Sequence, residues 1–446
     1  MNNTNYNKNL IDLQDDTIEI TNIIKTNNNN NNESIIEIHI QKSLVNSNKY
    51  CPHCGAVNII TKDYHTRKIK YIKIGLFNSY LIYKQRRFKC RECNKTFNET
   101  CSLVNKNSTI SNQVKTCILE EFKKKQSNKD IAERNNVSVT AANQAFIDTV
   151  LASRKKLPDI VCIDEFKANT IAGKYALIIG NPRTGEIIDI LPSRKQDYIY
   201  YYFLDISSEE RFKVKYIVTD LFESYRTIVK NLFPKAIHIA DRFHWIRLTV
   251  QAFDKLRINT MNTYFKKGKE TKNKDLIDFY EITKKNHKIL IANVHKKEIW
   301  YFDQQTKVPQ LKKVMSYQEI IEYIINFDKS LEEGYHLLQD LYKMAKFTSY
   351  YEAEKEILNW CEKAKNLESK LPEFRTVVLT YKSWIKEISN SFLFDPITKS
   401  RITNGFIEGK NNFCKVIKRV GFGYKNFDLF RAKVIHISNN LKDNNK

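Results

Sequence analysis

The run Asp159-Ile-Val-Cys-Ile163-Asp164-Glu165-Phe166 decides the fold of this chain. Its apolar, β-branched first half predicts a buried strand that ends at two acids. Two similar runs follow at Tyr175–Ile179 and Ile187–Leu191, and the segment between them, Asn181-Pro-Arg-Thr-Gly185, has the composition of a turn. The sequence therefore predicts three antiparallel strands in a row.

Helices and strands alternate after these three strands. The predicted elements are a helix over Gln196–Leu204, a strand over Val214–Val218 that ends at Thr219-Asp220, a helix from Phe222 to Leu232, a strand over Ala236–Ala240 that ends at Asp241-Arg242-Phe243-His244, and a helix over Trp245–Leu256. This order is typical of a ribonuclease-H-like α/β fold. We place the first part of that catalytic core at residues 156–253.

Long helical patterns interrupt the core over residues 254–398, for example Ile357, Cys361, Ala364 and Leu367. We interpret this segment as an all-helical insertion. Lysines outnumber acids between Lys255 and Lys297, which indicates either a surface that faces DNA or a solvated basic surface. A helix that carries Glu408 then returns to the core, whose C-terminal part we place at residues 399–446.

Two cysteine pairs lie upstream, in Cys51-Pro-His-Cys54-Gly55 and Cys90-Arg-Glu-Cys93. Each pair offers two thiolates to one tetrahedral zinc, and the alternating segment between them is typical of a hairpin. Residues 49–104 are therefore predicted to be a zinc ribbon with a structural ion; the alternative is four unrelated buried cysteines. Its basic residues would face phosphates: Arg67, Lys68, Lys70, Lys84, Arg86, Arg87 and Lys89.

Helical spacing begins at Ser111, and residues 105–155 are predicted to form a helix-turn-helix domain. One helix ends near Asn135 and Asn136, and a second, capped by Ser138, would enter the DNA major groove. An ordinary helical hairpin is the alternative. The residues of the second helix expected at DNA are Ser138, Thr140, Asn143 and Gln144.

Residues 1–48 contain the run Asn27–Asn32, and low-complexity asparagine buries little apolar surface. We therefore expect a flexible leader, in which Ile35–Ile40 is a candidate strand.

Composition points to an anionic partner. The 446 residues carry a formal net charge of +24, which favours nucleic acid, although a solvated lysine-rich surface is the alternative. The chain has neither an apolar run long enough to span a bilayer nor a signal-peptide pattern at its start, so we expect a cytoplasmic protein. Nine cysteines in such a chain favour metal binding over a disulfide framework.

Three acids are candidates for catalysis. Asp164 and Asp220 end strands that are neighbours in the predicted sheet, and Glu408 lies in a basic, amide-rich block from Ser400 to Arg419. Converging carboxylates require divalent cations, and oxygen ligands favour two Mg²⁺ or Mn²⁺ ions that activate water or a DNA 3′-hydroxyl. Helix or turn capping is the alternative for each acid, and Glu165 and Asp241 compete for the same roles.

The chain resembles DDE transposases of the insertion-sequence family called ISL-three. The resemblance covers Cys51 to the C-terminus and rests on the ribbon with Phe97 and Glu99, the strand ends at Asp164, Asp220 and Asp241-x-x-His244, and Glu408-Gly-x-Asn411 leading to Lys418-Arg419-x-Gly-Phe-Gly-Tyr424. It implies a catalytic triad of Asp164, Asp220 and Glu408. It also implies that Asp241 and His244 support the site or contact DNA; the alternative for His244 is a buried histidine at the start of a helix.

The expected function is a transposase that binds the terminal inverted repeats of an insertion sequence and performs metal-dependent strand cleavage and strand transfer. Residues expected to hold the backbone beside the cut are Lys410, Asn411, Lys415, Lys418 and Arg419. The expected partners are double-stranded DNA and a second copy in a DNA-bound dimer, in a bacterial protein associated with the nucleoid. Alternatives are a catalytically silent DNA-binding regulator and a ribonuclease-H-like nuclease without strand joining.

Overall fold

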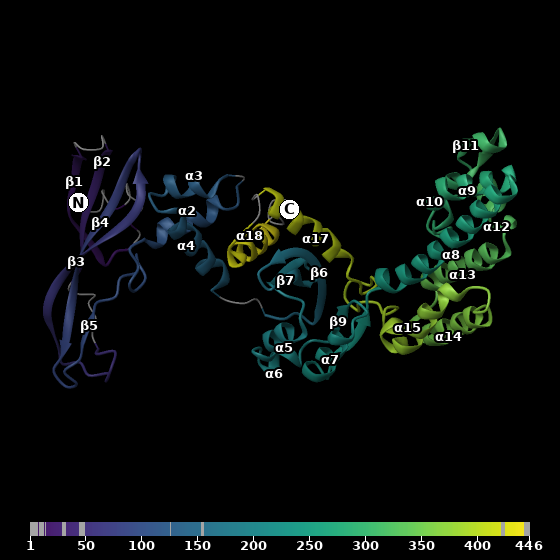
Figure 1. Cartoon of the computed structure of the whole chain (residues 1–446). Coiled ribbons are helices and arrows are strands. Elements are labelled where there is room, and N and C mark those ends of the chain that lie inside the picture. The colour runs from purple at the N-terminus through teal and green to yellow at the C-terminus, as the bar shows by residue number, and fades with distance from the viewer. Residues whose placement is uncertain are drawn as a thin grey trace. The chain divides into compact units, whose positions relative to one another are not determined.

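A computed structural model describes residues 8, 13, 15–28, 33–43, 50–124, 126–152, 156–420 and 424–440. The chain divides into two compact units. Figure 1 labels their helices and strands and colours the chain by residue number. The first unit combines Met1–Arg154 with Gly421–Lys446, and the second is Lys155–Val420. No helix in the described part of the chain combines the length and the apolar character needed to cross a membrane.

The first unit contains a sheet of order β1-β2-β4-β3, with β5 paired to β4. Its strands are β1 (Ile18–Asn28), β2 (Glu33–Lys42), β3 (Ile59–Ile74), β4 (Phe77–Cys90) and β5 (Thr96–Asn98). The hairpin predicted between the cysteine pairs is confirmed, because β3 and β4 are antiparallel and Ile59 lies opposite Cys90. The buried side chains Ile69, Tyr71, Leu81 and Tyr83 alternate along both strands and form the core of this sheet.

The expectation of a flexible leader is wrong for β1 and β2, while the candidate strand at Ile35–Ile40 is confirmed. The two strands pair with each other, and β2 runs parallel to β4. The physical reason is the period-two spacing of Ile38 and Ile40, which are 0% and 1% exposed and add to the same core. Within Asn27–Asn32, the residues 29–32 lie outside the described part of the chain.

Helices α2 (Asn112–Glu121), α3 (Asn128–Arg134) and α4 (Val139–Leu151) follow the sheet. Each begins at a serine whose side chain accepts a hydrogen bond from the backbone: Ser111, Ser127 and Ser138. Between α3 and α4, Asn136 has φ +52°, a left-handed conformation that asparagine tolerates. The predicted order of helix, asparagine turn and serine-capped helix is therefore present.

The C-terminal helix α18 (Phe427–Asn440) groups with this first unit. Leu429 and Ala432 of α18 are buried in the same cluster as Phe122 and Phe146, whose rings stack 4.1 Å apart. Residues 399–446 were predicted to be the C-terminal part of the catalytic core, and the division into compact units groups Gly421–Lys446 with the first unit. An apolar face shows that a helix is buried, but not which core buries it.

The second unit contains a sheet of order β10-β9-β6-β7-β8. Its strands are β6 (Ile160–Thr170), β7 (Gly173–Asn181), β8 (Glu186–Leu191), β9 (Tyr216–Thr219) and β10 (Ile237–Ala240). The three predicted antiparallel strands are confirmed as β6, β7 and β8, and β9 and β10 join them in parallel. Helices α5 (Gln196–Leu204), α6 (Ser208–Arg211) and α7 (Glu223–Leu232) lie between β8 and β10 in the chain and supply Ile199, Phe203, Ile228 and Val229 to the core.

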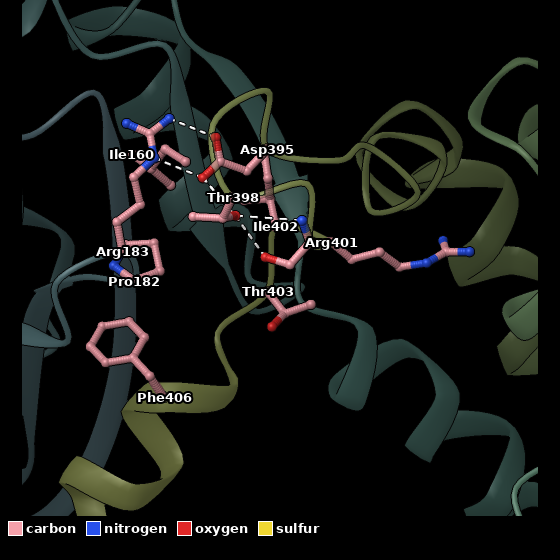
Figure 2. A pocket seen from close by; sticks show the side chains of 10 residues that line it. Ile160, Pro182, Arg183, Asp395, Thr398, Arg401, Ile402, Thr403 and Phe406 are labelled. Carbon is pink, nitrogen blue, oxygen red and sulfur yellow. Dashed lines mark hydrogen bonds and ion pairs between the residues drawn. The ribbon is translucent and has the colours of Figure 1, made fainter.

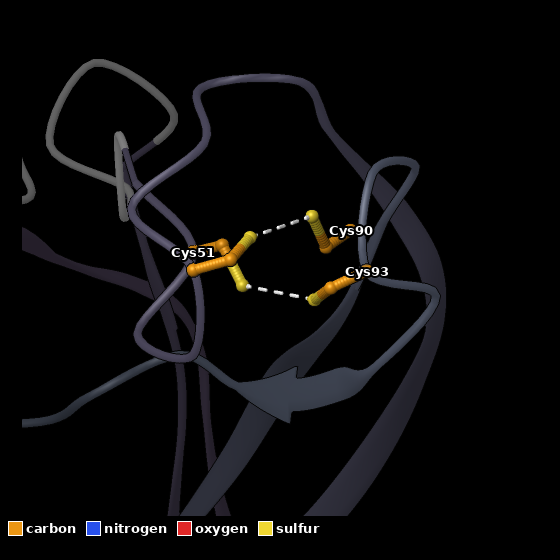
Figure 3. A group of neighbouring side chains, drawn as sticks. Cys51, Cys90 and Cys93 are labelled. Atoms are coloured by element: carbon orange, nitrogen blue, oxygen red, sulfur yellow. Dashed lines mark hydrogen bonds between the residues drawn. The ribbon is translucent and has the colours of Figure 1, made fainter.

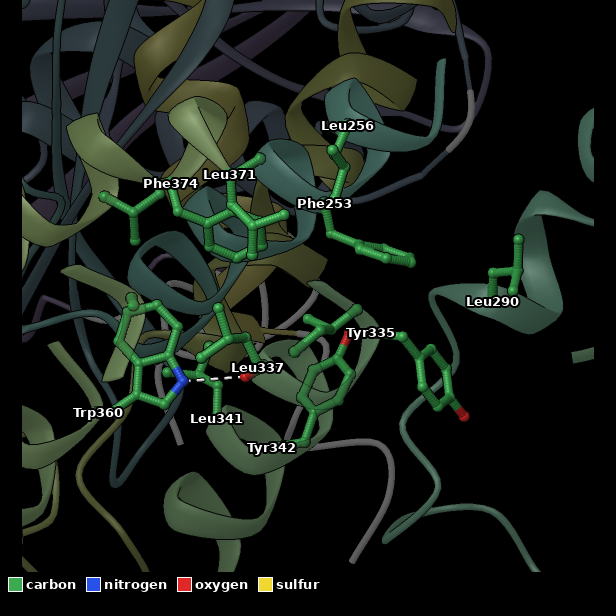
Figure 4. Close-up of a cluster of buried hydrophobic side chains, with 14 of the residues drawn as sticks. Phe253, Leu256, Leu290, Tyr335, Leu337, Leu341, Tyr342, Trp360, Leu371 and Phe374 are labelled. Atoms are coloured by element: carbon green, nitrogen blue, oxygen red, sulfur yellow. Dashed lines mark hydrogen bonds between the residues drawn. The ribbon is translucent and has the colours of Figure 1, made fainter. Parts of the chain in front are cut away.

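A large helical segment follows β10. It comprises α8 (Arg242–Thr271), α9 (Lys274–Lys285), α10 (His287–Leu290), α11 (Ile299–Phe302), α12 (Tyr317–Phe327), α13 (Lys329–Phe347), α14 (Tyr350–Asn366), α15 (Arg375–Ser383) and α16 (Ile385–Asn390). Figure 4 shows part of its core, including Phe253 and Leu256 of α8, Tyr335 of α13 and Trp360 of α14. The Trp360 indole donates a hydrogen bond to the Leu337 carbonyl at 2.9 Å.

The prediction that this segment is all-helical is wrong in one place. Strands β11 (Gln305–Val308) and β12 (Lys313–Ser316) form a two-stranded antiparallel sheet. Each strand has four residues, which is too short for a periodic pattern to be recognised. Helix α17 (Gly405–Val420) completes the second unit.

Candidate active site and metal centres

The first two candidate acids emerge at one edge of the second unit's sheet. Residues Ile160–Cys162 of β6 pair in parallel with Tyr216–Val218 of β9. Asp164 lies further along β6, and Asp220 directly follows β9. Parallel neighbours of this register bring both carboxylates to the same end of the sheet.

His244 joins these two acids. Potential ligand atoms of Asp164, Asp220 and His244 all lie within 4.8 Å of one another. His244 occupies the first turn of α8, whose N-cap is Asp241, and its Nε2 lies 3.0 Å from Asp220 Oδ1 and 3.8 Å from Asp241 Oδ2. Asp220 Oδ1 is buried and makes no hydrogen bond in the described structure. A buried oxygen that makes no hydrogen bond, beside a second carboxylate and an imidazole 3.0 Å away, fits a divalent cation.

Helix α17 contacts the cluster through amide side chains. Asn411 Nδ2 donates to Asp164 Oδ2 at 2.8 Å and lies 3.4 Å from the Glu165 carbonyl. Just before the helix, Asn404 donates from its backbone to Asp241 Oδ1 at 3.3 Å and from its side chain to the Ile163 carbonyl at 3.2 Å. These bonds fix the start of α17 against β6 and α8.

Glu408 lies one helical turn before Asn411, and its side chain is exposed. It is not a member of the group formed by Asp164, Asp220 and His244. Its charge nevertheless contributes to raising the pKa of Asp241, after the larger effect of burial. The structure therefore brings Glu408 near the site, while the imidazole of His244 lies closer to the two aspartates.

The competing acid Glu165 is engaged elsewhere. Its carboxylate pairs with Arg194 at 2.6 Å and accepts a hydrogen bond from the Tyr225 hydroxyl at 2.8 Å. Since adjacent residues of a strand point to opposite faces, Glu165 and Asp164 lead away from each other. Spacing along the sequence could not show whether Asp164 or Glu165 is the candidate catalytic acid. Their different contacts in the structure favour Asp164.

Burial dominates the electrostatics of the cluster. It raises the pKa of Asp220 to about 8, with further contributions from the charges of Asp164 and Asp241. Burial also raises the pKa of Asp164 and brings that of Asp241 to about 6. Burial lowers the pKa of His244, which favours a neutral imidazole that can bind a metal. Several carboxyls with raised pKa values at one place are typical of a site that a cation completes.

The four ribbon cysteines form a second group, shown in Figure 3. Cys51 Sγ lies 3.7 Å from Cys93 Sγ, and Cys54 Sγ lies 3.6 Å from Cys90 Sγ. A tetrahedral zinc with sulfurs at about 2.3 Å separates those sulfurs by about 3.8 Å. The four thiols therefore fit one zinc ion, and four sulfur ligands leave no open position for catalysis.

Two family models match the chain. One, described as a transposase of the ISL3 type with a DDE site, matches residues 161–434, more than half of the 446 residues. The other, described as the zinc-finger of transposase IS204/IS1001/IS1096/IS1165, matches residues 48–93 and so spans all four ribbon cysteines. The chain belongs to the ISL3 family of DDE transposases. The resemblance to ISL-three enzymes that the sequence motifs indicated is thus confirmed.

A curated relative is less informative about this ISL3 family member. An "ATP-dependent protease" of Lactococcus lactis subsp. lactis is 25% identical over 118 residues, which are 26% of this chain. The chain spans about a third of the length of that relative, 34%.

The loop that leads into α17 of this ISL3 protein is fixed to the far end of the sheet, as Figure 2 shows. Arg183, in the turn between β7 and β8, makes two bonds of 2.7 Å to the two oxygens of Asp395 and one of 2.5 Å to Asp159. Asp395 also accepts hydrogen bonds from Ile397 N and the Thr398 hydroxyl, both at 3.0 Å. A pocket beside this loop is lined by Pro182, Ile402, Thr403 and Phe406, among others.

Arg86, which was predicted to bind DNA, is buried. Arg86 is 3% exposed, pairs with Glu99 at 3.0 Å and donates to the Lys42 and Ser43 carbonyls. Its prediction as a DNA contact is therefore wrong, because β2 and the segment after β5 cover it. Its neighbour Arg87 keeps 42% of its side chain exposed, 3.9 Å from Asp63.

The remaining predicted DNA contacts are distributed over both units. At the start of α4, Ser138, Thr140 and Gln144 are exposed, Asn143 is half-buried, and the Ser138 hydroxyl caps the helix. On α17, Lys415 and Arg419 are exposed, whereas Lys410 is half-buried and Lys418 donates to the Ala168 carbonyl. Sequence reasoning placed Asn411 at DNA and missed its bond to Asp164; its spacing of three residues from Glu408 was the signal.

Proposed function

We propose that this ISL3 family member is a DNA transposase that cuts the ends of its own element and joins them to target DNA. The single observation that carries the proposal is the meeting of Asp164, Asp220 and His244 at one sheet edge, with α17 bonded to Asp164 through Asn411. Acids from neighbouring strands and a helix from far along the chain together make a site for metal-dependent phosphodiester chemistry.

We interpret the second unit as a ribonuclease-H-like core. Three antiparallel strands, then two parallel strands reached through helices, support this interpretation, as does the sheet order β10-β9-β6-β7-β8. The helical segment between β10 and α17 is the insertion. The insertion lies between the second and the third proposed acid in the chain. The chain therefore leaves the core after β10 and returns to it at α17.

Asp164, Asp220 and Glu408 are the proposed ligands of two Mg²⁺ or Mn²⁺ ions, and His244 is a further candidate ligand. When bound, such ions lower the pKa of an attacking water or hydroxyl and neutralise charge on the leaving oxygen. Glu408 is exposed on α17, where a cation and DNA together would draw its carboxylate toward Asp241 and His244. Asp241 is a positioning residue: it holds the Asn404 backbone and lies 3.8 Å from His244.

Two successive displacements then account for the reaction. Water attacks the phosphodiester at the element end and frees a 3′-hydroxyl, which attacks target DNA in line. Both the nucleophile and the leaving group are oxygens of water or DNA, so no covalent intermediate with a protein side chain is needed. The contribution of the chain is to hold the backbone next to Asp164 and Asp220, for which Lys415 and Arg419 on α17 are exposed.

The first unit is the proposed reader of the element end. Helices α3 and α4 with the turn at Asn136 support a helix-turn-helix whose second helix presents Ser138, Thr140, Asn143 and Gln144 to the major groove. Arg87 on β4 adds a phosphate contact. Because a transposition event joins two ends, the proposed working form is a dimer on DNA.

The deciding experiment incubates the purified chain with duplexes that carry the ends of its own element, in Mg²⁺, and resolves the products on a sequencing gel. Cleavage at the end followed by joining to a second duplex is the expected result. Saturated binding with intact DNA would instead make the chain a silent regulator. Hydrolysed ends that never join would make it a nuclease.

A further inference from the structure

The far part of α8 and the helices α9 and α10 that follow it expose a set of lysines that the proposed chemistry does not use. We call Lys266, Lys269, Lys284 and Lys288 the lysine face; all four are exposed. The spacing of three residues places Lys266 with Lys269 on one side of α8. Lys284 lies in the last turn of α9, and Lys288 lies in the short helix α10 that follows it. Across residues 255–297, twelve lysines and arginines stand against four acids.

The acids of α9 form no ion pair with these lysines in the described residues. The charges of Asp278 and Asp275 act on Tyr323 of α12, whose pKa is raised by burial and by both carboxylates. Glu281 accepts a hydrogen bond from Gln310 at 2.9 Å. In the described part of the chain, none of the four lysines forms an ion pair, although Glu270 next to Lys269 is exposed. The four ammonium groups are therefore not engaged in ion pairs and can contact an anion.

Aromatic side chains hold two of the four lysines in place. Phe265 of α8 and Tyr280 of α9 stack with ring centres 4.3 Å apart. Lys269 lies over the Phe265 ring at 4.5 Å, and Lys284 lies over the Tyr280 ring at 5.3 Å and donates to its hydroxyl at 3.1 Å. Ammonium groups held over rings keep less rotamer freedom than freely solvated ones, so less entropy is lost when they bind an anion.

We propose that the lysine face binds the backbone of the DNA that flanks the element, about ten base pairs from the phosphodiester that is cut. This inference rests on the proposed function. Lysine is a point charge that contacts phosphates without reading bases, which suits a duplex whose sequence differs at every insertion site. The element's own end has a fixed sequence, so it can be recognised by side chains that contact the edges of the bases.

The length of α8 gives the distance. His244, in the candidate active site, and Lys266–Lys269 lie on the same continuous helix, α8, which Figure 1 labels. At 1.5 Å per residue the separation is about 35 Å. A duplex that rises 3.4 Å per base pair covers that length in about ten base pairs, one helical turn.

The test uses the full chain and a quadruple variant, Lys266→Gln, Lys269→Gln, Lys284→Gln and Lys288→Gln. The matched control neutralises four exposed lysines elsewhere in the second unit, with Lys213→Gln, Lys230→Gln, Lys355→Gln and Lys365→Gln. The probe is an end-containing duplex with 25 base pairs of flanking DNA on which hydroxyl-radical protection and the salt dependence of binding are measured, in Ca²⁺ so that the DNA stays intact.

The wild type and the control are expected to protect flanking DNA about ten base pairs from the cut, and the lysine-face variant to lose that protection. The slope of log Kobs against log salt should fall by about 3 to 4 in the variant, close to 0.9 per phosphate contact. Equal salt slopes in the variant and the control, or protection only on the element side of the cut, would overturn the inference. The lysine face would then be a solvent-exposed surface that does not contact DNA. Cleavage by the wild type in Mg²⁺ is scored separately, so that failure of the proposed function is distinguished from failure of this inference.

Discussion

Asn411 Nδ2 donates a hydrogen bond to Asp164 Oδ2 across 2.8 Å, and the two residues are separated by 247 positions in the chain. The bond joins the helix that carries Glu408 to the strand that carries the first acid. Because one Asp164 oxygen is held by Asn411 and the other by the Glu165 backbone at 2.7 Å, the carboxylate has a fixed orientation.

Asn411→Ala should therefore lower cleavage while end binding stays near that of the wild type. Removing a hydrogen-bond partner of a metal ligand commonly lowers activity or metal affinity by about 10- to 100-fold. Initial cleavage rates across an Mg²⁺ titration would check this, with exposed Asn412→Ala as the control. A variant with an unchanged rate at every Mg²⁺ concentration would remove Asn411 from the positioning of Asp164.

Gly180 on β7 lies directly beside Phe406 of α17. A methyl group at Gly180 would lie 2.6 Å from the Phe406 ring. Gly180→Ala should push α17 outward, destabilise the second unit by about 1–3 kcal/mol and reduce cleavage. Denaturant unfolding and cleavage rates measure both effects, and adding Phe406→Leu should restore part of each.

Gly409→Ala is the matched control for that variant, since a methyl group there meets nothing within 4 Å. It replaces a glycine inside α17 and should raise stability by about 0.5–1 kcal/mol. If Gly180→Ala behaved like Gly409→Ala, close packing of Phe406 would not determine the position of α17.

The Arg183–Asp395 pair should couple the loop before α17 to the sheet. Asp395 is 3% exposed, and the Arg183 guanidinium bonded to it holds the pKa of its carboxyl well below the usual range. Asp395→Asn leaves Arg183 with only the half-buried Asp159 and should destabilise the second unit by about 3 kcal/mol. Unfolding of Asp395→Asn, Arg183→Leu and the double variant forms a cycle, in which strictly additive losses would contradict a coupled pair.

The lowered pKa of His238 should make the stability of the second unit depend on pH. Its Nε2 lies 2.8 Å from the Thr219 hydroxyl, and burial lowers its pKa to about 4, against a weaker raising effect of Glu387 at 3.9 Å and a further lowering by Arg226. The unfolded chain, with a histidine pKa near 6.5, binds the proton first as pH falls. Stability should thus be full above about pH 6.5 and fall by up to about 3 kcal/mol toward pH 4.

Urea unfolding between pH 4.5 and pH 7.5 tests this dependence. His238→Gln keeps a group that can bond Thr219 but does not titrate, so its stability should change less with pH over this range. If the free energy of unfolding changed equally with pH in wild type and variant, titratable groups other than His238 would cause the pH dependence.

Zinc removal should unfold the ribbon. Cys90→Ser leaves three thiolates, and the ends of β3 and β4 meet at Cys90. Loss of bound zinc and a lower unfolding temperature of the first unit are expected, measured by metal analysis and circular dichroism. Cys101→Ser, outside the four-cysteine group, is the control and should retain zinc. Full zinc content in Cys90→Ser would refute a four-cysteine site.

The elements that local chemistry specifies could be predicted from the residues alone. Cysteine pairs indicated the ribbon, β-branched runs ending in Asp164 and Asp220 indicated neighbouring strands, and serine caps with an asparagine turn indicated α3 and α4. Each of these signals is a spacing or a residue type that acts within a few positions, so it can be read along the chain.

The folded structure sets which residues from distant segments become partners. It engaged Glu165 with Arg194 and Tyr225, buried Arg86 against Glu99, and bonded Asn411 to Asp164. It also assigned α18 to the first unit and gave the leader two strands. Carboxylates and guanidinium groups have the same local pattern whether they face solvent, a metal or each other, and their burial and their partners depend on contacts between segments far apart in the sequence.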